Sequence, residues 1–299
     1  MTTTKHVRRV LGLAAMAAVA VGVAPAAHAT PVPPTASSAL AGTWVNTNSA
    51  SRSVKQIIVT PLRGGHLGVD AFGACTPTLC EWGSVPAIVY GTSVSSTTGT
   101  TFQSNQRFLS RDREWSRTQL QGTVYRTLRG LRLLVRELTV FEDGSGRKNY
   151  TVTETFRLGE AHRPTRAGNP VSGYPRGNPP ALVAGDFGSW TNVAPSGGLV
   201  KLTIGGSQAA PVVQAFGQCS PTPCDWGKVA SITYGSSISS QVGTTTLAPY
   251  VFGFKNAQLV IRYWINAAGD ERLTVAGYNE FTDGSGRSNY TKTETFART

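Results

Sequence analysis

The residues whose types suit catalysis recur in pairs, because the chain contains one segment twice. Residues 141–156 (FEDGSGRKNYTVTETF) and 281–296 (FTDGSGRSNYTKTETF) are identical at 13 of 16 positions, at a constant offset of 140. The carboxyl groups that recur there are Asp143 and Glu154, matched by Asp283 and Glu294. Two carboxyl groups in each copy are the set that glycoside hydrolysis requires. A carboxylate-dependent hydrolase is therefore one hypothesis for this chain.

A structural role explains the same carboxyl groups, and we favour it. Asp143 precedes Gly144, and an Asp-Gly pair is typical of a hairpin turn in which the aspartate bonds nearby backbone. Glu154 lies on the apolar-containing face of an alternating segment, where burial would require a cationic partner, with Arg147 or Arg132 as candidates. No histidine recurs, and no nucleophile, metalloprotease or nucleotide motif is present. We expect no catalytic residues.

The four cysteines form two matched pairs, Cys75 with Cys80 and Cys219 with Cys224. An even number of cysteines in an exported chain predicts disulfides, and pairing inside each copy is the simplest connectivity. A metal site would need further ligands, and no histidine is shared by the copies. We predict two disulfides, no metal and no cofactor.

An acidic residue and a tryptophan follow each cysteine pair, Glu81 and Trp82 in the first copy and Asp225 and Trp226 in the second. A disulfide-braced loop beside an indole is typical of a rigid binding tip, because aromatic faces stack on sugar rings and on partner side chains. Alternatively, the tryptophan fills the core and the disulfide only braces the loop. These four residues are the candidate ligand contacts.

The elements that position these residues are predicted to be strands. Apolar and polar residues alternate, as in Val200, Leu202 and Ile204, and clusters of Gly, Asn, Asp and Ser separate the segments. Each copy holds about eight such segments, and each copy is about as long as one ordinary domain. The sequence therefore predicts an all-β fold of two tandem antiparallel up-and-down barrels, with two β-sandwiches as the alternative.

Composition divides the chain into five parts. Residues 1–29 combine a basic start, an apolar stretch and an Ala-His-Ala cleavage site, and are predicted to be a signal peptide of bacterial kind. A Pro/Ser-rich leader follows at 30–39, then the first barrel at 40–158. A Pro/Gly-rich linker at 159–180 precedes the second barrel at 181–299. The export route, general secretory or twin-arginine, stays open, and no later stretch is apolar enough to cross a membrane.

Positive charge is concentrated in the first copy. The chain carries a formal net charge of +12, and eight arginines lie between Arg107 and Arg136. Such a cluster is suited to an anionic extracellular polymer, or it is only a solvated basic surface. No zinc-finger or RNA-binding motif is present, and export argues against a genomic target, so nucleic acid is not favoured as a partner.

The opening of each copy resembles the calycin group of lipocalins and avidins. Each first strand carries a G-x-W motif, which places Trp44 and Trp190 at the position of the calycin tryptophan. This resemblance implies a structural tryptophan that closes one barrel end, covered by an arginine from near the domain end, for which Arg157 and Arg298 are the candidates. The motif is three residues long, and a shared fold does not transfer function.

Together these observations predict a secreted, extracellular, non-catalytic binding protein. Its two barrels would recognise a glycan, a small ligand or a protein through their loops or their mouths. A protein–protein adaptor or inhibitor is the second hypothesis, and the carboxylate-dependent hydrolase is the third. An open, partly apolar barrel interior would favour the small ligand.

Overall fold

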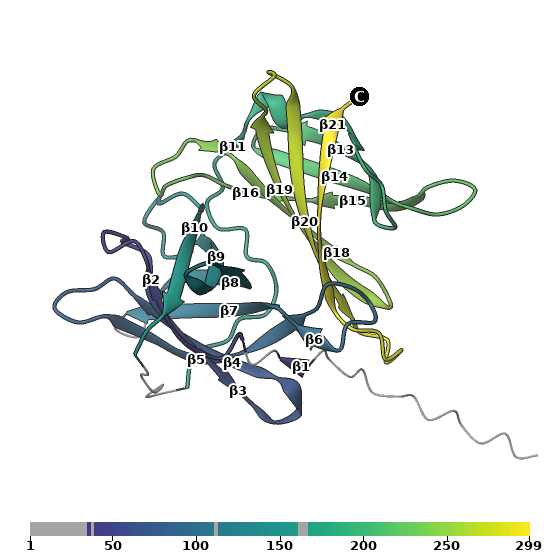
Figure 1. The fold of residues 1–299 in the computed structure, drawn as a ribbon. Coiled ribbons are helices and arrows are strands. Elements are labelled where there is room, and N and C mark those ends of the chain that lie inside the picture. Colours follow the sequence, from purple (N-terminus) through teal and green to yellow (C-terminus); the bar gives the residue numbers. More distant parts are fainter. Residues whose placement is uncertain (1–34, 37–38, 111–112, 161–166) are drawn as a thin grey trace, which may run out of the picture.

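The computed structural model describes residues 35–36, 39–110, 113–160 and 167–299 (Figure 1). The predicted signal peptide and most of the Pro/Ser-rich leader lie outside this part of the chain. The described residues form strands, with two short 3-10 turns, η1 (Arg63–Gly65) and η2 (Ala184–Asp186). The fold is all-β, as predicted.

The first copy is a closed antiparallel barrel of eight strands. In chain order these are β2 (Gly42–Asn46), β3 (Val54–Pro61), β4 (Leu67–Gly73), β5 (Cys80–Tyr90), β7 (Thr101–Ser110), β8 (Arg113–Thr127), β9 (Gly130–Val140) and β10 (Tyr150–Leu158). Each strand pairs with the next, and β10 returns to pair with β2. The up-and-down topology is confirmed, and the sandwich alternative is wrong for this copy.

The second copy is a nearly closed sheet of nine strands. They are β12 (Gly188–Asn192), β13 (Leu199–Ser207), β14 (Ala210–Gly217), β15 (Cys224–Ala230), β16 (Ile232–Tyr234), β18 (Thr245–Val251), β19 (Lys255–Ile265), β20 (Glu271–Phe281) and β21 (Tyr290–Arg298). The extra strand arises because the element that matches β5 is divided in two. Its first part, β15, pairs with β14, and its second part, β16, pairs with β18.

A pair of two-residue strands accompanies each barrel in the same way. In the first copy β1 (Thr35–Ala36) pairs in parallel with β6 (Thr98–Gly99). In the second copy β11 (Ala181–Leu182) pairs in parallel with β17 (Val242–Gly243). The segment that enters each barrel is therefore held by the loop that precedes β7 or β18, so the repeat extends beyond the barrel strands.

Alternation along the strands separates the barrel interior from its surface. In β9, Leu133 and Val135 are fully buried, whereas Leu134 between them is 42% exposed. The period of two places one set of side chains in the barrel and the other set outside it. Fifteen buried residues form the core of each copy, with Trp44 in the first and Trp190 in the second.

The two G-x-W tryptophans close the same end of their barrels. Both are fully buried, and their Nε1 atoms donate to main-chain carbonyls, Trp44 to Leu40 at 2.9 Å and Trp190 to Asp186 at 3.0 Å. Each acceptor precedes the first strand. The satisfied indole N–H makes complete burial of these large side chains favourable. Their structural role agrees with the prediction.

In the second copy an arginine lies over this tryptophan. The Arg298 guanidinium lies 4.4 Å from the centre of the Trp190 ring and donates to the Phe187 carbonyl at 2.7 Å. In the first copy Leu158, not Arg157, occupies the matching register position opposite Trp44. Arg157 is exposed, so its expected contact with the tryptophan does not follow from the fold.

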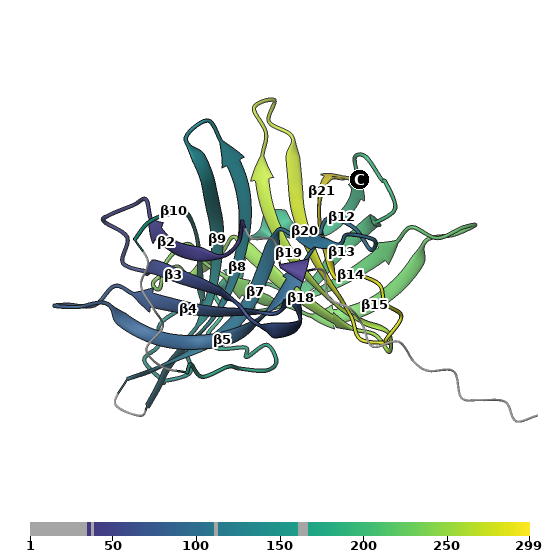
Figure 2. The ribbon, with the colours of Figure 1, turned by 60° about the horizontal axis from the view of Figure 1, so that its bottom comes forward.

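The two barrels lie side by side (Figures 1 and 2). The duplicated block joins them through reciprocal backbone hydrogen bonds. Gly91 donates to the Asn289 carbonyl at 2.8 Å, and the matching Gly235 donates to the Asn149 carbonyl at 2.9 Å. Thr291 donates back to Gly91 at 3.0 Å, as Thr151 does to Gly235 at 2.8 Å. The interface is therefore isologous within one chain: the same segment of each copy contacts the same loop of the other.

Apolar side chains fill this interface. One cluster combines outward-facing residues of both barrels: Tyr90, Leu138, Val140, Ile232, Tyr234, Leu247, Val260, Ala276 and Tyr278. The rings of Tyr90 and Tyr278 meet edge to face with their centres 5.5 Å apart. Beside the cluster, Gln258 Nε2 donates to Gln119 Oε1 at 2.6 Å. The barrels are packed on a shared core.

The described part of the connector is bound to the barrels. Gly168 donates to the Ser84 carbonyl at 2.7 Å, and Asn169 accepts from the Arg107 N–H at 3.0 Å, both along the first barrel. Farther on, Asn178 accepts from the Asn149 N–H at 2.9 Å. Backbone hydrogen bonds therefore attach residues 167–180 of the Pro/Gly-rich segment to the first barrel.

Candidate functional site

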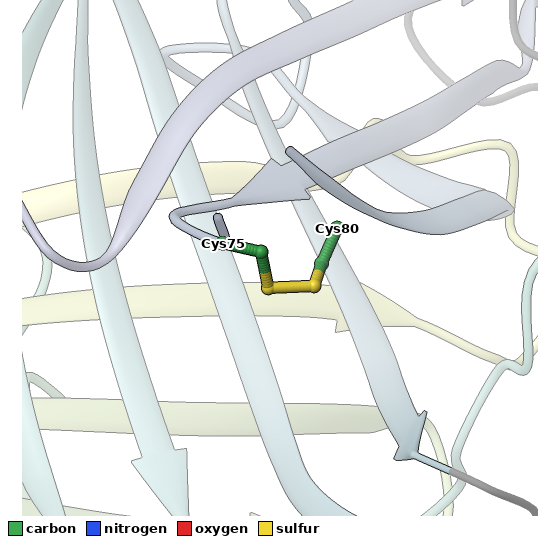
Figure 3. Close-up of a disulfide and its surroundings, with 2 residues drawn as sticks. All are labelled: Cys75 and Cys80. Carbon is green, nitrogen blue, oxygen red and sulfur yellow. A yellow bond between two sulfur atoms is a disulfide. The ribbon is translucent and has the colours of Figure 1, made fainter. Parts of the chain in front are cut away.

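Both predicted disulfides are present, and each braces a loop at the end of its barrel. Figure 3 shows the disulfide of the first copy, between Cys75 and Cys80. Cys75 pairs with Cys80 and Cys219 with Cys224, with Cα atoms 5.4 and 5.5 Å apart. The loops connect β4 to β5 and β14 to β15. They lie where β2 and β12 end, whereas the residues that bond Trp44 and Trp190 lie where these strands begin. Each barrel is therefore closed at one end and has its disulfide at the other.

A cavity opens at the disulfide end of the first barrel, with a volume of about 570 Å³. Its aromatic lining comprises Trp82, Phe108, Phe141 and Tyr150, and Glu154 supplies a carboxyl group. Part of its rim comes from the second barrel, through residues 236–238. We refer to this cavity as the first mouth.

The second barrel has a cavity of about 380 Å³ at the matching end, the second mouth. Its lining repeats the first in the positions of the disulfide, of an aromatic set and of a glutamate. The matched aromatic and acidic residues are Trp226, Phe252, Tyr290 and Glu294. Sequence reasoning identified the tryptophans and the cysteines but did not place them around a cavity.

The predicted binding tryptophans form a wall of each mouth. Trp82 lies 6.0 Å from Phe108 between ring centres, and Trp226 lies 5.4 Å from Phe252. Both indoles are partly buried and also pack against the barrel core. The two alternatives for these residues, binding surface and core filling, are therefore combined: one part of each indole lines the cavity and another supports it.

The acidic residues that precede these tryptophans contribute less to the lining of the mouths. Asp225 is exposed, lines the second mouth and accepts hydrogen bonds from Gln214 Nε2 at 2.7 Å and from the Gly227 N–H at 2.8 Å. Glu81 pairs with Phe72 across the sheet, and it is not among the described residues that line the first mouth. The structure brings Asp225, and not Glu81, to a mouth.

The recurring glutamates bond amide side chains and not the expected arginines. Glu154 Oε2 accepts from Asn46 Nδ2 at 2.5 Å, and Glu294 Oε1 accepts from Asn192 Nδ2 at 3.1 Å. In the second copy Lys292 adds an ion pair with Glu294 at 3.2 Å. The prediction that Arg147 or Arg132 pairs with Glu154 is wrong, because the recurring asparagine at the end of the first strand is closer.

The recurring aspartates have the predicted turn role. Asp143 accepts from the Ser145 N–H at 3.1 Å and from Arg147 Nη2 at 2.5 Å. Asp283 repeats both bonds with Ser285 and Arg287. The hydrogen bond from the serine side chain and the arginine charge hold the pKa of both carboxyl groups below their usual value, and both groups are exposed. They fix the loop and do not enter the lining of a mouth in the described chain.

Glu137, which the sequence analysis missed, lies beneath the first mouth. It is fully buried, accepts a short hydrogen bond from the Ser53 hydroxyl, and has no hydrogen-bond partner among described residues for Oε1. Burial raises the pKa of Glu137 to about 8; the Ser53 hydrogen bond opposes this shift, and the nearby Glu154 adds to it. Its signal in the sequence is an acidic residue that follows Leu133 and Val135 on the inward face of β9.

Lys255, also missed, lies in the second mouth. It is 9% exposed, its Nζ lies 4.3 Å from the centre of the Trp226 ring, and it donates to Asn279 Oδ1 at 3.1 Å. Burial lowers the pKa of Lys255 to about 8, and the positive charge of Arg287 adds to the shift. Its signal is a lysine that directly follows the alternating aromatic residues Phe252 and Phe254.

The two mouths differ in the ionisable residues at matching positions. Gly277 takes the place of Glu137, at the same offset of 140 that relates the duplicated blocks. Lys255 takes the place of Ser116, because each lies opposite the recurring phenylalanine of the preceding strand. Ser116 pairs with Phe108, and the Lys255 carbonyl accepts from the Phe252 N–H. The first mouth has Glu137 beneath it and Arg52 and Arg147 in its lining, and the second holds the buried ammonium group of Lys255.

In the arginine-rich segment, the arginines whose side chains the structure describes do not line either mouth. Arg126 and Arg129 are exposed near the β8–β9 hairpin, and Arg117 forms an ion pair with Glu142 at 2.9 Å. Binding of an anionic polymer by this segment stays a prediction.

Comparison with protein-family models and with curated proteins finds no match for this chain. Among the described residues, no helix is long and apolar enough to cross a membrane. In the same part of the chain, no group of three or more histidine, cysteine or acidic residues is arranged to hold a metal ion.

Proposed function

We propose that this chain is a secreted, non-catalytic binding protein whose two barrel mouths each bind a small organic ligand. The observation that carries the proposal is the recurrence of a cavity at the same end of both barrels, built from matched residues. A barrel of eight strands has room for a filled core or for one small ligand. Here the core fills the tryptophan end, and the disulfide end is left open. The calycin resemblance, which is still a proposal, is compatible with this arrangement.

The lining supports a ligand that is largely apolar and carries a few polar groups. Aromatic rings supply contact area, while Glu154 or Glu294 supplies an oriented carboxylate. The disulfide holds the loop beside Trp82 or Trp226, which reduces the ordering that binding requires. Volumes of about 570 and 380 Å³ match ligands of cofactor or metabolite size.

Equilibrium dialysis tests this proposal. The full chain is dialysed against the low-mass fraction of a culture extract, and the retained compounds are identified by mass spectrometry. We expect Trp82→Ala and Trp226→Ala each to lose retained compounds that wild type holds, while Trp264→Ala, on an exposed strand end, keeps them all. Identical retention by wild type and both mouth variants would contradict the proposal, and retention of oligosaccharides alone would assign the mouths to glycans.

The hydrolase hypothesis gains one observation in the first mouth only. Glu137, with its raised pKa, and Glu154 are two neighbouring carboxyl groups that differ in environment, as an acid and a base do. Gly277 replaces Glu137 in the second copy, so the pair is not a shared mechanism. Hydrolysis of a glycoside by wild type, lost in Glu154→Gln with the fold preserved, would establish this alternative.

A further inference from the structure

The ammonium group of Lys255 is enclosed by aromatic rings and faces a cavity. Besides Trp226, the rings of Phe252 and Phe254 lie 5.5 and 5.9 Å from Nζ between atom and ring centre. These rings stabilise the cation through their electron-rich faces, but they offer it no strong hydrogen-bond acceptor. Asn279 Oδ1 accepts one hydrogen bond from this group, whereas an ammonium group has three N–H donors.

No carboxylate of the described chain neutralises this charge. No carboxylate oxygen there lies within 4 Å of Lys255, and the charge of Arg287, which contributes to lowering its pKa, is also positive. The other acidic groups of the mouth are engaged: Glu294 pairs with Lys292, and Asp225 accepts from Gln214. A buried cation without an anion is unfavourable. An anionic ligand would supply the missing negative charge and would be stabilised by the ion pair.

The floor of the second mouth leaves room for such a ligand. Gly277 lines the cavity, and an added Cβ there would meet its nearest neighbours, Asn279 and Leu259, at an ordinary 3.6 Å. The first mouth has Glu137 at this position and Ser116 in place of the lysine. The first mouth therefore lacks the buried ammonium group that could pair with an anion in the second.

We propose that the second mouth binds a small organic anion, a carboxylate or sulfonate with an aromatic or aliphatic body, whose charged group pairs with Lys255 while its body packs against Trp226 and Phe252. This inference rests on the proposed binding function and names the ligand class of one of its two sites. We do not expect the first mouth to select that class, because Ser116 stands there in place of Lys255.

Titration calorimetry with 2-naphthoate and its neutral analogue 2-naphthamide tests the inference on the full chain. We expect naphthoate to bind once per chain, at least about 10-fold more tightly than naphthamide, because a charged hydrogen bond contributes this much. Lys255→Met removes the preference, Lys255→Arg keeps it and Trp82→Ala leaves it unchanged. Circular dichroism verifies that each variant is folded.

Three results would overturn the anion assignment. They are a preference that survives Lys255→Met, a preference that Trp82→Ala removes, and no binding of naphthoate to wild type. If both compounds bind equally and both are lost in Trp226→Ala, the second mouth is a binding site without anion selectivity. In that case this inference fails while the proposed function stands, and the dialysis experiment still decides the function.

Discussion

Gly91 of the first barrel donates its backbone N–H to the carbonyl oxygen of Asn289 in the second barrel at 2.8 Å. Gly235 makes the matching bond to Asn149 from the other side, so each copy contacts the other through the same two segments. The near-identity of the duplicated block follows from this geometry, since both copies must present the same backbone to the same loop. The block is a domain interface as well as the last strand of each barrel.

Substitution of the interface glycines should therefore destabilise the pair of barrels. A Cβ at Gly91 would clash with Ser96, and a Cβ at Gly235 would clash with the matching Ser240. We expect Gly91→Ala or Gly235→Ala to cost about 1–3 kcal/mol, as overpacking typically does. Urea unfolding measures the loss. Gly205→Ala is the control, because its Cβ meets nothing within 4 Å; equal midpoints for Gly91→Ala and this control would contradict the close packing of this loop against Ser96.

The arginine at the end of the second barrel should contribute to stability, whereas its nearest counterpart in the first should not. Arg298 covers Trp190 and bonds the carbonyls of Phe187 and Gly185. Arg298→Ala removes this contact, the two carbonyl hydrogen bonds and the ion pair with Glu271, and should cost about 1–2 kcal/mol. Arg157→Ala, an exposed substitution, should change stability by less than about 0.5 kcal/mol. Thermal unfolding compares the two, and equal losses would contradict the assignment.

Glu137 should make the folded protein less stable as the pH rises. Its pKa is raised from 4.5 to about 8 in the folded state, so between these values the folded state binds a proton that the unfolded state has released. Stability falls with pH where the unfolded state binds fewer protons, and the loss is complete above about pH 8. Replacement by glutamine, Glu137→Gln, removes this ionisation.

The difference between wild type and Glu137→Gln isolates the effect, because all other groups titrate in both. The melting temperature of wild type should decrease relative to the variant between pH 5 and about pH 8. A difference that does not vary with pH would mean that Glu137 titrates near its ordinary pKa, which its burial opposes.

Binding of naphthoate by the second mouth should weaken at high pH. Lys255 has a pKa of about 8, and only its protonated form attracts the anion. Above this value the affinity should fall by up to about tenfold per pH unit, while naphthamide binding stays constant. Asp225, Arg287 and the Lys292–Glu294 pair also face this site, so Lys255→Arg is the control: it stays charged and should flatten the profile. A wild-type profile that is flat to pH 10 would contradict the role of Lys255.

The sequence predicted the features that recur and that depend on neighbouring residues. Alternation identified the strands, and the matched cysteines identified both disulfides. Asp143 was placed in its turn because an aspartate before a glycine can bond the backbone two residues on. The partner of Glu154 was not predictable in this way, because Asn46 is distant in the chain and comes near only when the barrel closes.

The charged residues of the mouths were missed because they do not recur. A comparison of the two copies selects shared positions, and Glu137 and Lys255 have Gly277 and Ser116 as their matches. The interface was hidden for a different reason. A duplicated block can reflect either contacts between the copies or closure of each barrel. Only the positions of the Gly91 and Gly235 loops in the structure distinguish these two roles.

The measurement that tests the central claim most directly is the NMR spectrum of the indole N–H groups with and without the low-mass culture extract. If the mouths bind ligand, the signals of Trp82 and Trp226 should shift, while those of the buried Trp44 and Trp190 should stay in place. Lack of any shift at Trp82 and Trp226, or shifts confined to Trp264 on its exposed strand end, would contradict a binding role for the barrel mouths.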